Sequence, residues 1–244
     1  MTQGFKVYNS NKFIQIDSTY QNMHCVKKST VVLPKATLTS DGYANRNPYR
    51  YNVQKQNNIV AVRKIENMGA FNNMLVSIEP RLDSTGKAYY NISTTNTDAD
   101  ETVILYEYSL ENSKSPATHG VRVYNSATKA LVFDSGYAPL NVMDYTKITL
   151  PTSGGVVINP DISRTLDPNK LYAYTAFENF VSWVINDVNF YLGVGAFAHY
   201  TSDTGETIVR YVRSGGRISI PRYSGLTTYQ DPHVTFLITD VTNI

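Results

Sequence analysis

One short segment occurs twice in this chain of 244 residues, and this repeat limits the fold more than any other feature. Residues 4–10 read Gly-Phe-Lys-Val-Tyr-Asn-Ser, and residues 120–126 read Gly-Val-Arg-Val-Tyr-Asn-Ser. After a one-residue insertion, residues 14–20 align with residues 131–137, and each of these segments contains Asp-Ser. Leu-Pro then follows at the same distance from the aspartate in both copies. The repeat therefore predicts a structural unit that is present twice.

Each copy has the sequence pattern of a β-hairpin. Phe5 and Val7 alternate with polar neighbours, as do Val121 and Val123, and this alternation is typical of a strand. The Asn-Ser that follows predicts a turn, because asparagine tolerates turn geometry and bonds its own backbone. The next apolar segment predicts a return strand that ends at Asp-Ser, whose side chains compete for backbone hydrogen bonds. We expect each copy to begin with such a hairpin.

The rest of the chain predicts an all-β fold. The sequence contains 19 tyrosines among many Val, Thr and Ile residues, which suit a pleated and half-buried surface. The polar, proline-containing segment 113–119 precedes the second copy and predicts a linker. We therefore expect two tandem, related β-sandwich-like domains at residues 1–112 and 120–244. The spacing of apolar residues over 177–188 fits a helix or a strand, and its β-branched content favours a strand.

Further strands are expected wherever short apolar segments lie between turn signals. They are 28–33, 58–65, 74–78, 88–94 and 102–110 in the first domain, and 147–150, 155–158, 171–177, 190–194, 207–212, 217–221 and 233–239 in the second. Residues 34–56 form a long polar segment that we expect to be an exposed loop.

Residues that could perform catalysis or bind metals are few. Cys25 is the single cysteine, so an internal disulfide and a cysteine-based metal cage are excluded. His24 precedes it, but neighbouring side chains on a strand point to opposite faces and cannot form a catalytic pair. Asp98, Asp100 and Glu101 lie in an acidic segment that lacks the glycine and the later glutamate of a calcium loop. We therefore predict no enzymatic activity, no catalytic residues, no cofactor and no metal.

Three tyrosines in the long polar segment are candidates for an interface. Tyr43, Tyr49 and Tyr51 would be exposed there, and exposed aromatic residues are enriched where proteins meet. The alternative is that these tyrosines cover the sheet. The net charge of +2 comes from scattered basic residues, which disfavours nucleic acid as a partner. The first residues lack an apolar signal core, and no apolar run approaches the about 20 residues that cross a bilayer. We expect synthesis in the cytoplasm without membrane insertion.

The repeated unit resembles a hairpin found in the minor tail and tail-fibre-associated structural proteins of tailed bacteriophages. Residues 4–18 and 120–135 carry this resemblance, through the glycine, the Val-Tyr-Asn-Ser segment and the closing Asp-Ser. The resemblance implies a non-enzymatic virion component that is assembled in the host cytoplasm. Its implied partners are other tail or capsid proteins and further copies of itself, as a homo-oligomer.

Two more specific roles follow from this resemblance. The sequence has no long repetitive shaft, which favours a tail-tip protein, a tail-fibre adaptor or a decoration protein over a complete fibre. The alternative is a receptor- or carbohydrate-binding module of the virion that engages the host surface, with tyrosines and Trp183 on one concave face. A glycan depolymerase would need a long β-helix period, which this sequence lacks.

Overall fold

In the computed structural model of this protein, every described regular element is a β-strand and every strand pair is antiparallel, which confirms the all-β fold. The described residues are 6–8, 14–17, 22–38, 44–45, 47–65, 76–94, 96–110, 117–149, 162–167, 169–176, 181–184, 191–200, 206–213 and 233–244.

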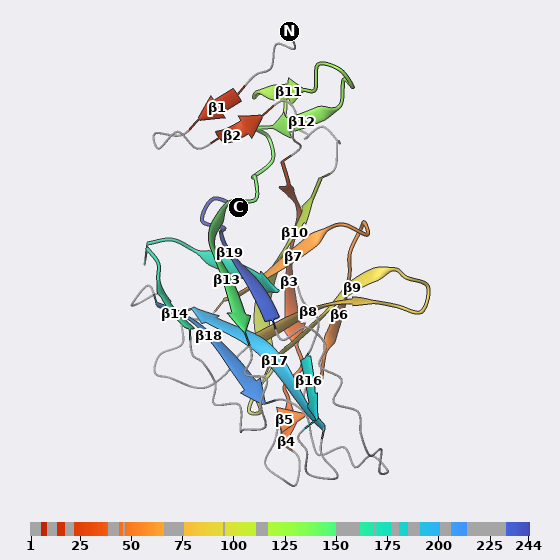
Figure 1. Ribbon diagram of the computed structural model, residues 1–244, viewed down its shortest axis with the longest axis vertical. Helices are drawn as coiled ribbons and strands as arrows, with labels where there is room; N and C mark the ends of the chain where they lie inside the picture. The colour runs from red at the N-terminus through yellow and green to blue at the C-terminus, as the bar shows by residue number, and fades with distance from the viewer. Residues whose placement is uncertain are drawn as a thin grey trace.

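Two large sheets form the body of the molecule (Figure 1). The first contains, in spatial order, β13 (Val142–Thr149), β19 (His233–Asp240), β15 (Tyr172–Ala176), β7 (Ile59–Lys64), β10 (Glu101–Ser109) and β3 (His24–Leu33). The second contains β14 (Ile162–Thr165), β18 (Glu206–Arg213), β17 (Tyr191–Tyr200), β8 (Val76–Leu82), β9 (Ala88–Thr94) and β6 (Tyr49–Asn52), and β16 (Val181–Val184) pairs with β17. Both sheets therefore join strands from the two halves of the chain.

Both copies of the repeat form the predicted hairpin. The first hairpin pairs β1 (Lys6–Tyr8) with β2 (Ile14–Asp17), and the second pairs β11 (Arg122–Tyr124) with β12 (Leu131–Asp134). Each has a register shift at the step from valine to tyrosine in its first strand. The predicted hairpin is thus confirmed in both copies, down to the position of its irregularity. A further two-stranded sheet joins β4 (Thr37–Leu38) and β5 (Ala44–Asn45).

In each large sheet, the strands from the second half of the chain are arranged as a mirror image of the strands from the first half. In the first sheet, β3 and β13 are the edges, β10 and β19 lie next to them, and β7 meets β15 in the middle. The second sheet repeats this arrangement, with β8 meeting β17. Strands at mirrored positions come from corresponding parts of the two halves of the chain.

An irregularity in the two edge strands of the first sheet supports this correspondence. Val26 of β3 has no partner where the register with β10 shifts, and Met143 of β13 has none where the register with β19 shifts. These residues are as far apart in sequence as Leu33 and Leu150, which the sequence repeat aligns. A bulge re-aims an edge strand and increases its twist. Both halves of the chain therefore have a bulge at the corresponding position of their edge strand in the first sheet.

The two large sheets pack face to face around a shared apolar core. Its fully buried members include Val62 and Leu105 from the first sheet and Ile78 and Ile92 from the second. A second buried cluster on the outer face of the first sheet contains Tyr106, Tyr108 and Val241.

Most of the strands predicted by apolar periodicity lie where they were expected, with ends displaced by a few residues. The segment 34–56 was expected to be an exposed loop, and this prediction was wrong for residues 49–52. They form β6, which pairs with β9 at the edge of the second sheet. Four residues that alternate tyrosine with polar side chains were too short a pattern to be recognised. Within 177–188, the described residues form strand β16, as the β-branched content favoured. The expected strands 155–158 and 217–221 lie outside the described residues.

We expect Tyr174→Phe to lower the free energy of unfolding by about 1–3 kcal/mol. Tyr174 of β15 is buried in the shared core, and its hydroxyl donates a hydrogen bond to the carbonyl oxygen of Val76 in β8 at 2.9 Å. The change would leave this buried carbonyl without its partner. Urea denaturation followed by circular dichroism measures the loss. Tyr124→Phe is the control, because Tyr124 is exposed, and it should change stability little. Equal stability of the two variants would contradict the assigned role.

Candidate functional site

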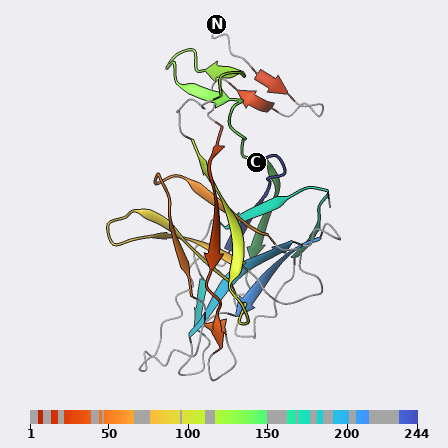
Figure 2. The same ribbon diagram turned by 180° about the vertical axis from the view of Figure 1, so that it is seen from behind.

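The two repeated hairpins lie together at one end of the molecule, beyond the body (Figures 1 and 2). We call the β1–β2 and β11–β12 hairpins the hairpin head. It is the structural form of the motif that carries the family resemblance, so it is the first candidate for a functional surface. The side chains of the β11–β12 hairpin show why the motif has its particular residues.

The first residue of the motif must be glycine in the second copy. Gly120 has a φ of +142°, which side chains rarely adopt, and a Cβ atom there would collide with Oγ of Ser135. This oxygen accepts a hydrogen bond from the backbone N–H of Val121 at 2.7 Å. The glycine at the start and the serine at the end of the motif therefore close the hairpin together.

The remaining motif residues have equally local roles. Asp134 is buried and accepts hydrogen bonds from Nε of Arg122 at 2.8 Å and from the N–H of Gly136 at 2.8 Å. The hydrogen bond to this carboxylate raises the pKa of Arg122. Asn125 begins the turn, since its Oδ1 accepts from the N–H groups of Ala127 and Thr128. In the second copy, the motif residues thus fix the shape of the hairpin.

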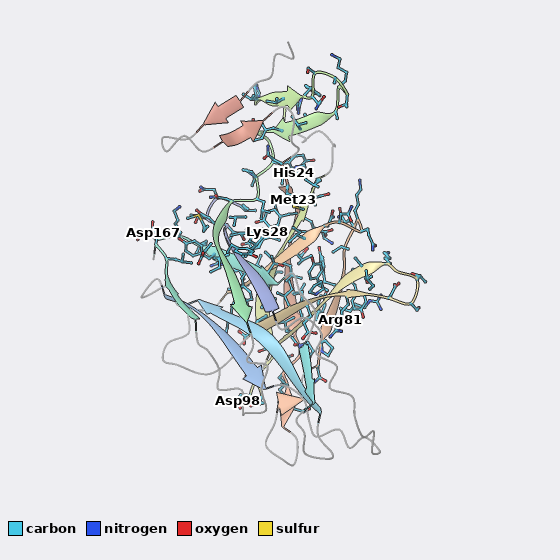
Figure 3. All side chains as sticks on the ribbon, viewed as in Figure 1. Met23, His24, Lys28, Arg81, Asp98 and Asp167 are labelled. Carbon is cyan, nitrogen blue, oxygen red and sulfur yellow. The ribbon has the colours of Figure 1, made fainter. Side chains whose placement is uncertain are left out.

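A short antiparallel pairing of two chain segments connects the head to the body. Residues 22–25 run antiparallel to residues 137–140, through hydrogen bonds from Cys25 N to Ala138 O and from Leu140 N to Met23 O, both 2.8 Å. The ring of His24 stacks on that of Tyr137, with centroids 4.5 Å apart. Figure 3 shows Met23 and His24 between the hairpins and the body. These two segments follow the repeat in the two halves, so the halves also meet here.

His24 and Cys25 do not form a catalytic pair. His24 packs against Tyr137, whereas Cys25 packs on the outer apolar cluster of the body and its thiol points to the carbonyl oxygen of Lys27. Burial raises the pKa of Cys25 to about 11 and lowers the pKa of His24. Both groups are therefore uncharged at neutral pH, and Cys25 is a thiol rather than a nucleophilic thiolate.

We predict that Cys25 reacts with iodoacetamide at pH 8 at least about 100-fold more slowly than free cysteine, because thiolate is the reactive form. Mass spectrometry of samples quenched over time gives the rate. Labelling in 8 M urea is the control, and unfolding should restore the rate of an ordinary thiol. A native rate close to that of free cysteine would show that the thiol is neither buried nor shifted in pKa.

Of the three tyrosines that the sequence grouped as an interface, the structure describes Tyr49 and Tyr51. Tyr43 lies outside the described residues. Tyr49 is half-buried against the shared core, and Tyr51 is a member of that core. Tyr51 therefore has no exposed ring to offer a partner, because alternation along β6 turns it toward the first sheet. The sequence left open whether these tyrosines form an interface or cover the sheet. Tyr49 and Tyr51 cover the sheet.

Below Tyr51 lies a buried carboxylate that sequence patterns did not reveal. Glu107 of β10 is fully buried and accepts three hydrogen bonds: from the Tyr51 hydroxyl at 2.7 Å, from Asn58 Nδ2 at 2.6 Å and from the Gln54 N–H at 2.7 Å. The available signal was that Glu107 shares the alternation of the inward-facing Val103 and Leu105 of β10. These donors fix the turn between β6 and β7 to β10, the strand next to the β3 edge of the first sheet.

We expect Glu107→Ala to lower the free energy of unfolding by more than about 3 kcal/mol, since it leaves several buried donors unpaired. Glu107→Gln keeps one carbonyl oxygen as an acceptor and should cost less. Asp98→Ala on the exposed acidic loop is the control. Chemical denaturation of the three variants tests the order of stabilities. A loss in Glu107→Ala no larger than that in the control would contradict a structural role for this carboxylate.

The acidic segment near residue 100 is built from internal hydrogen bonds. Asn96 Oδ1 accepts from the N–H groups of Asp98 and Ala99, and buried Glu101 pairs with Lys64 Nζ at 2.7 Å. Asp100 Oδ1 accepts from the N–H of Lys35 at 2.9 Å. Within the part of the chain that the structure describes, no group of His, Cys, Asp or Glu side chains is arranged to hold a metal ion.

Comparison with known proteins gave no relatives. No family model, no curated protein and no solved structure matches this chain. Among the described residues, no helix exists that is long and apolar enough to cross a membrane. The functional argument therefore depends on the repeat, the fold and the contacts given above.

Proposed function

We propose that this protein is a non-enzymatic structural component of a bacteriophage virion, acting as a tail-tip protein, a tail-fibre adaptor or a decoration protein. The observation that carries the proposal is the hairpin head, because it is formed by the two segments that resemble phage tail proteins. Its partners would be other virion proteins, reached through one end of the molecule.

We further propose that the two halves, 1–112 and 120–244, are copies of one β-domain that are joined edge to edge. The matching strand order, the matching bulges and the two hairpins support this duplication. A joined pair suits an assembly role, since the two related copies present two related hairpins on the same side of the body. Such a pair can contact two neighbouring subunits of a symmetric assembly.

The contacts of the ionisable side chains support a structural role. Glu107 holds a turn, Glu101 is paired with Lys64, and Asp134 is paired with Arg122. Each of these buried carboxylates is bound by a donor group of the same chain. The surface of the head includes Val121 and Tyr124, which are both exposed apolar residues suited to contact another protein.

The test is to identify the protein in purified virions of the phage that encodes it. Particles purified on two successive density gradients should contain the chain at a fixed copy number relative to the major capsid protein, as measured by quantitative mass spectrometry. An abundant host protein serves as the control for contamination. Absence from the particles, or a copy number that falls with each purification step, would overturn the proposal. Binding of purified chain to host cells without a place in the virion would favour a separate receptor-binding role.

A further inference from the structure

The antiparallel pairing of residues 22–25 with 137–140, which we call the neck, has a symmetric register. The hydrogen bond from Leu140 N to Met23 O, 2.8 Å long, places these two residues opposite each other. They are as far apart in sequence as the aspartates that close the two copies of the repeat. Each residue of this pair therefore faces its own equivalent in the other half of the chain. A contact of this kind is typical of a two-fold axis that passes between the two residues.

Two contacts in the body have the same character. Strand β7 meets β15 in the first sheet, and β8 meets β17 in the second. The strands of each pair are antiparallel and occupy mirrored positions in their sheet. A rotation by 180° exchanges such strands, and a contact between equivalent segments lies on the rotation axis. The duplication proposed above therefore places one pseudo-two-fold axis through both sheets and the neck, and Figure 3 shows Met23 of the neck between the body and the head.

The two hairpins of the head are attached to the neck in the same way. Asp17 at the end of β2 precedes Met23 by as many residues as Asp134 at the end of β12 precedes Leu140. The registers of the two hairpins also agree, including the position of the bulge. The axis that passes through the neck therefore exchanges the two hairpins, and it leaves the molecule between them.

The second hairpin has two exposed apolar side chains that do not contribute to its closure. Val121 is 56% exposed and Tyr124 is 42% exposed. The hydrogen bonds that close this hairpin use other side chains of the motif. At the aligned positions, the first copy has Phe5 and Tyr8. An apolar residue and a tyrosine therefore occur at the same two positions of both copies.

We propose that the hairpin head binds a partner protein across a two-fold axis of that partner, with one hairpin on each of two identical subunits. The proposal rests on the virion role and the duplication proposed above. Two like surfaces related by a rotation of 180° match two like sites that are related by the same rotation. An apolar residue beside a tyrosine is suited to a protein interface, whereas a nucleic acid would require a basic surface. One copy of this chain thus serves two subunits of its partner.

Two equivalent contacts also make weak individual contacts sufficient. Once one hairpin is bound, the second binding event is intramolecular, and it can raise the affinity by about 10²–10⁴-fold. The neck and the two sheet junctions hold both hairpins on one body, so little further ordering is needed. Loss of either contact should therefore remove most of the binding.

The experiment replaces Tyr8 or Tyr124 of the full-length chain by the photo-reactive amino acid p-benzoylphenylalanine. Each variant is supplied to a phage that lacks its own copy, and the purified particles are irradiated. Mass spectrometry then identifies the cross-linked peptides. We expect both positions to cross-link to the same peptide of the same virion protein. Leu82 of β8, which is 64% exposed on the body, is the matched control and should not cross-link to that peptide.

A second measurement tests whether both contacts are used. Tyr8→Ala and Tyr124→Ala should each lower the number of copies per particle at least about tenfold, and by similar factors, because each leaves one contact. Leu82→Ala should leave the copy number unchanged. Circular dichroism and thermal unfolding of the purified chains show whether each variant is folded, and the cross-linking result does not depend on the alanine variants.

The outcomes separate this proposal from the virion role. Cross-links from the two positions to different proteins, to different peptides of one protein, or only within the chain would overturn the two-fold contact while leaving the chain a virion component. The same holds for a cross-link from one hairpin alone. Absence of the unmodified chain from the particles would overturn the virion role and this proposal together.

Discussion

The antiparallel pairing of β7 with β15, and of β8 with β17, holds the two halves of the chain in one body. Only a few residue pairs form these two junctions, yet both large sheets pass through them. Tyr174 strengthens the contact, because it belongs to β15 of the first sheet and bonds the backbone of β8 in the second. The shared core then contains side chains from both halves, so neither half buries its apolar surface alone.

The corresponding positions of the two halves have different chemical roles. The bulges align Glu107 of β10 with Ile238 of β19, since each is the last residue before the register shifts. Both residues are buried, but Glu107 holds a turn through three donors whereas Ile238 is an ordinary core residue. The edges differ in the same way, with lysines on β3 and exposed apolar residues on β13. The two halves therefore share one backbone arrangement but carry different side chains at corresponding positions.

The hairpin head shows how much of a candidate site a short motif can predict. In the β11–β12 hairpin, the asparagine, aspartate and serine each make a hydrogen bond within the hairpin, and the glycine leaves room for the serine hydroxyl. The strands, the turn and the ending aspartate were therefore predictable from local sequence. The antiparallel pairing that attaches the head to the body was not predictable from the sequence. The segments 22–25 and 137–140 have no shared pattern that indicates pairing, because their contact depends on how the two halves meet.

The sequence by itself determined the all-β fold, the repeated hairpin and most strand positions, because alternation and turn chemistry act over a few neighbouring residues. It also determined that His24 and Cys25 could not act together, since neighbours on a strand face opposite sides. Only the tertiary structure decided that residues 49–52 form an edge strand, that Tyr51 is buried and that Glu107 lies beneath it. It also decided that the two halves share their sheets. The physical reason is that burial and strand partners depend on residues far away in the chain, and no local pattern specifies which distant strand will supply them.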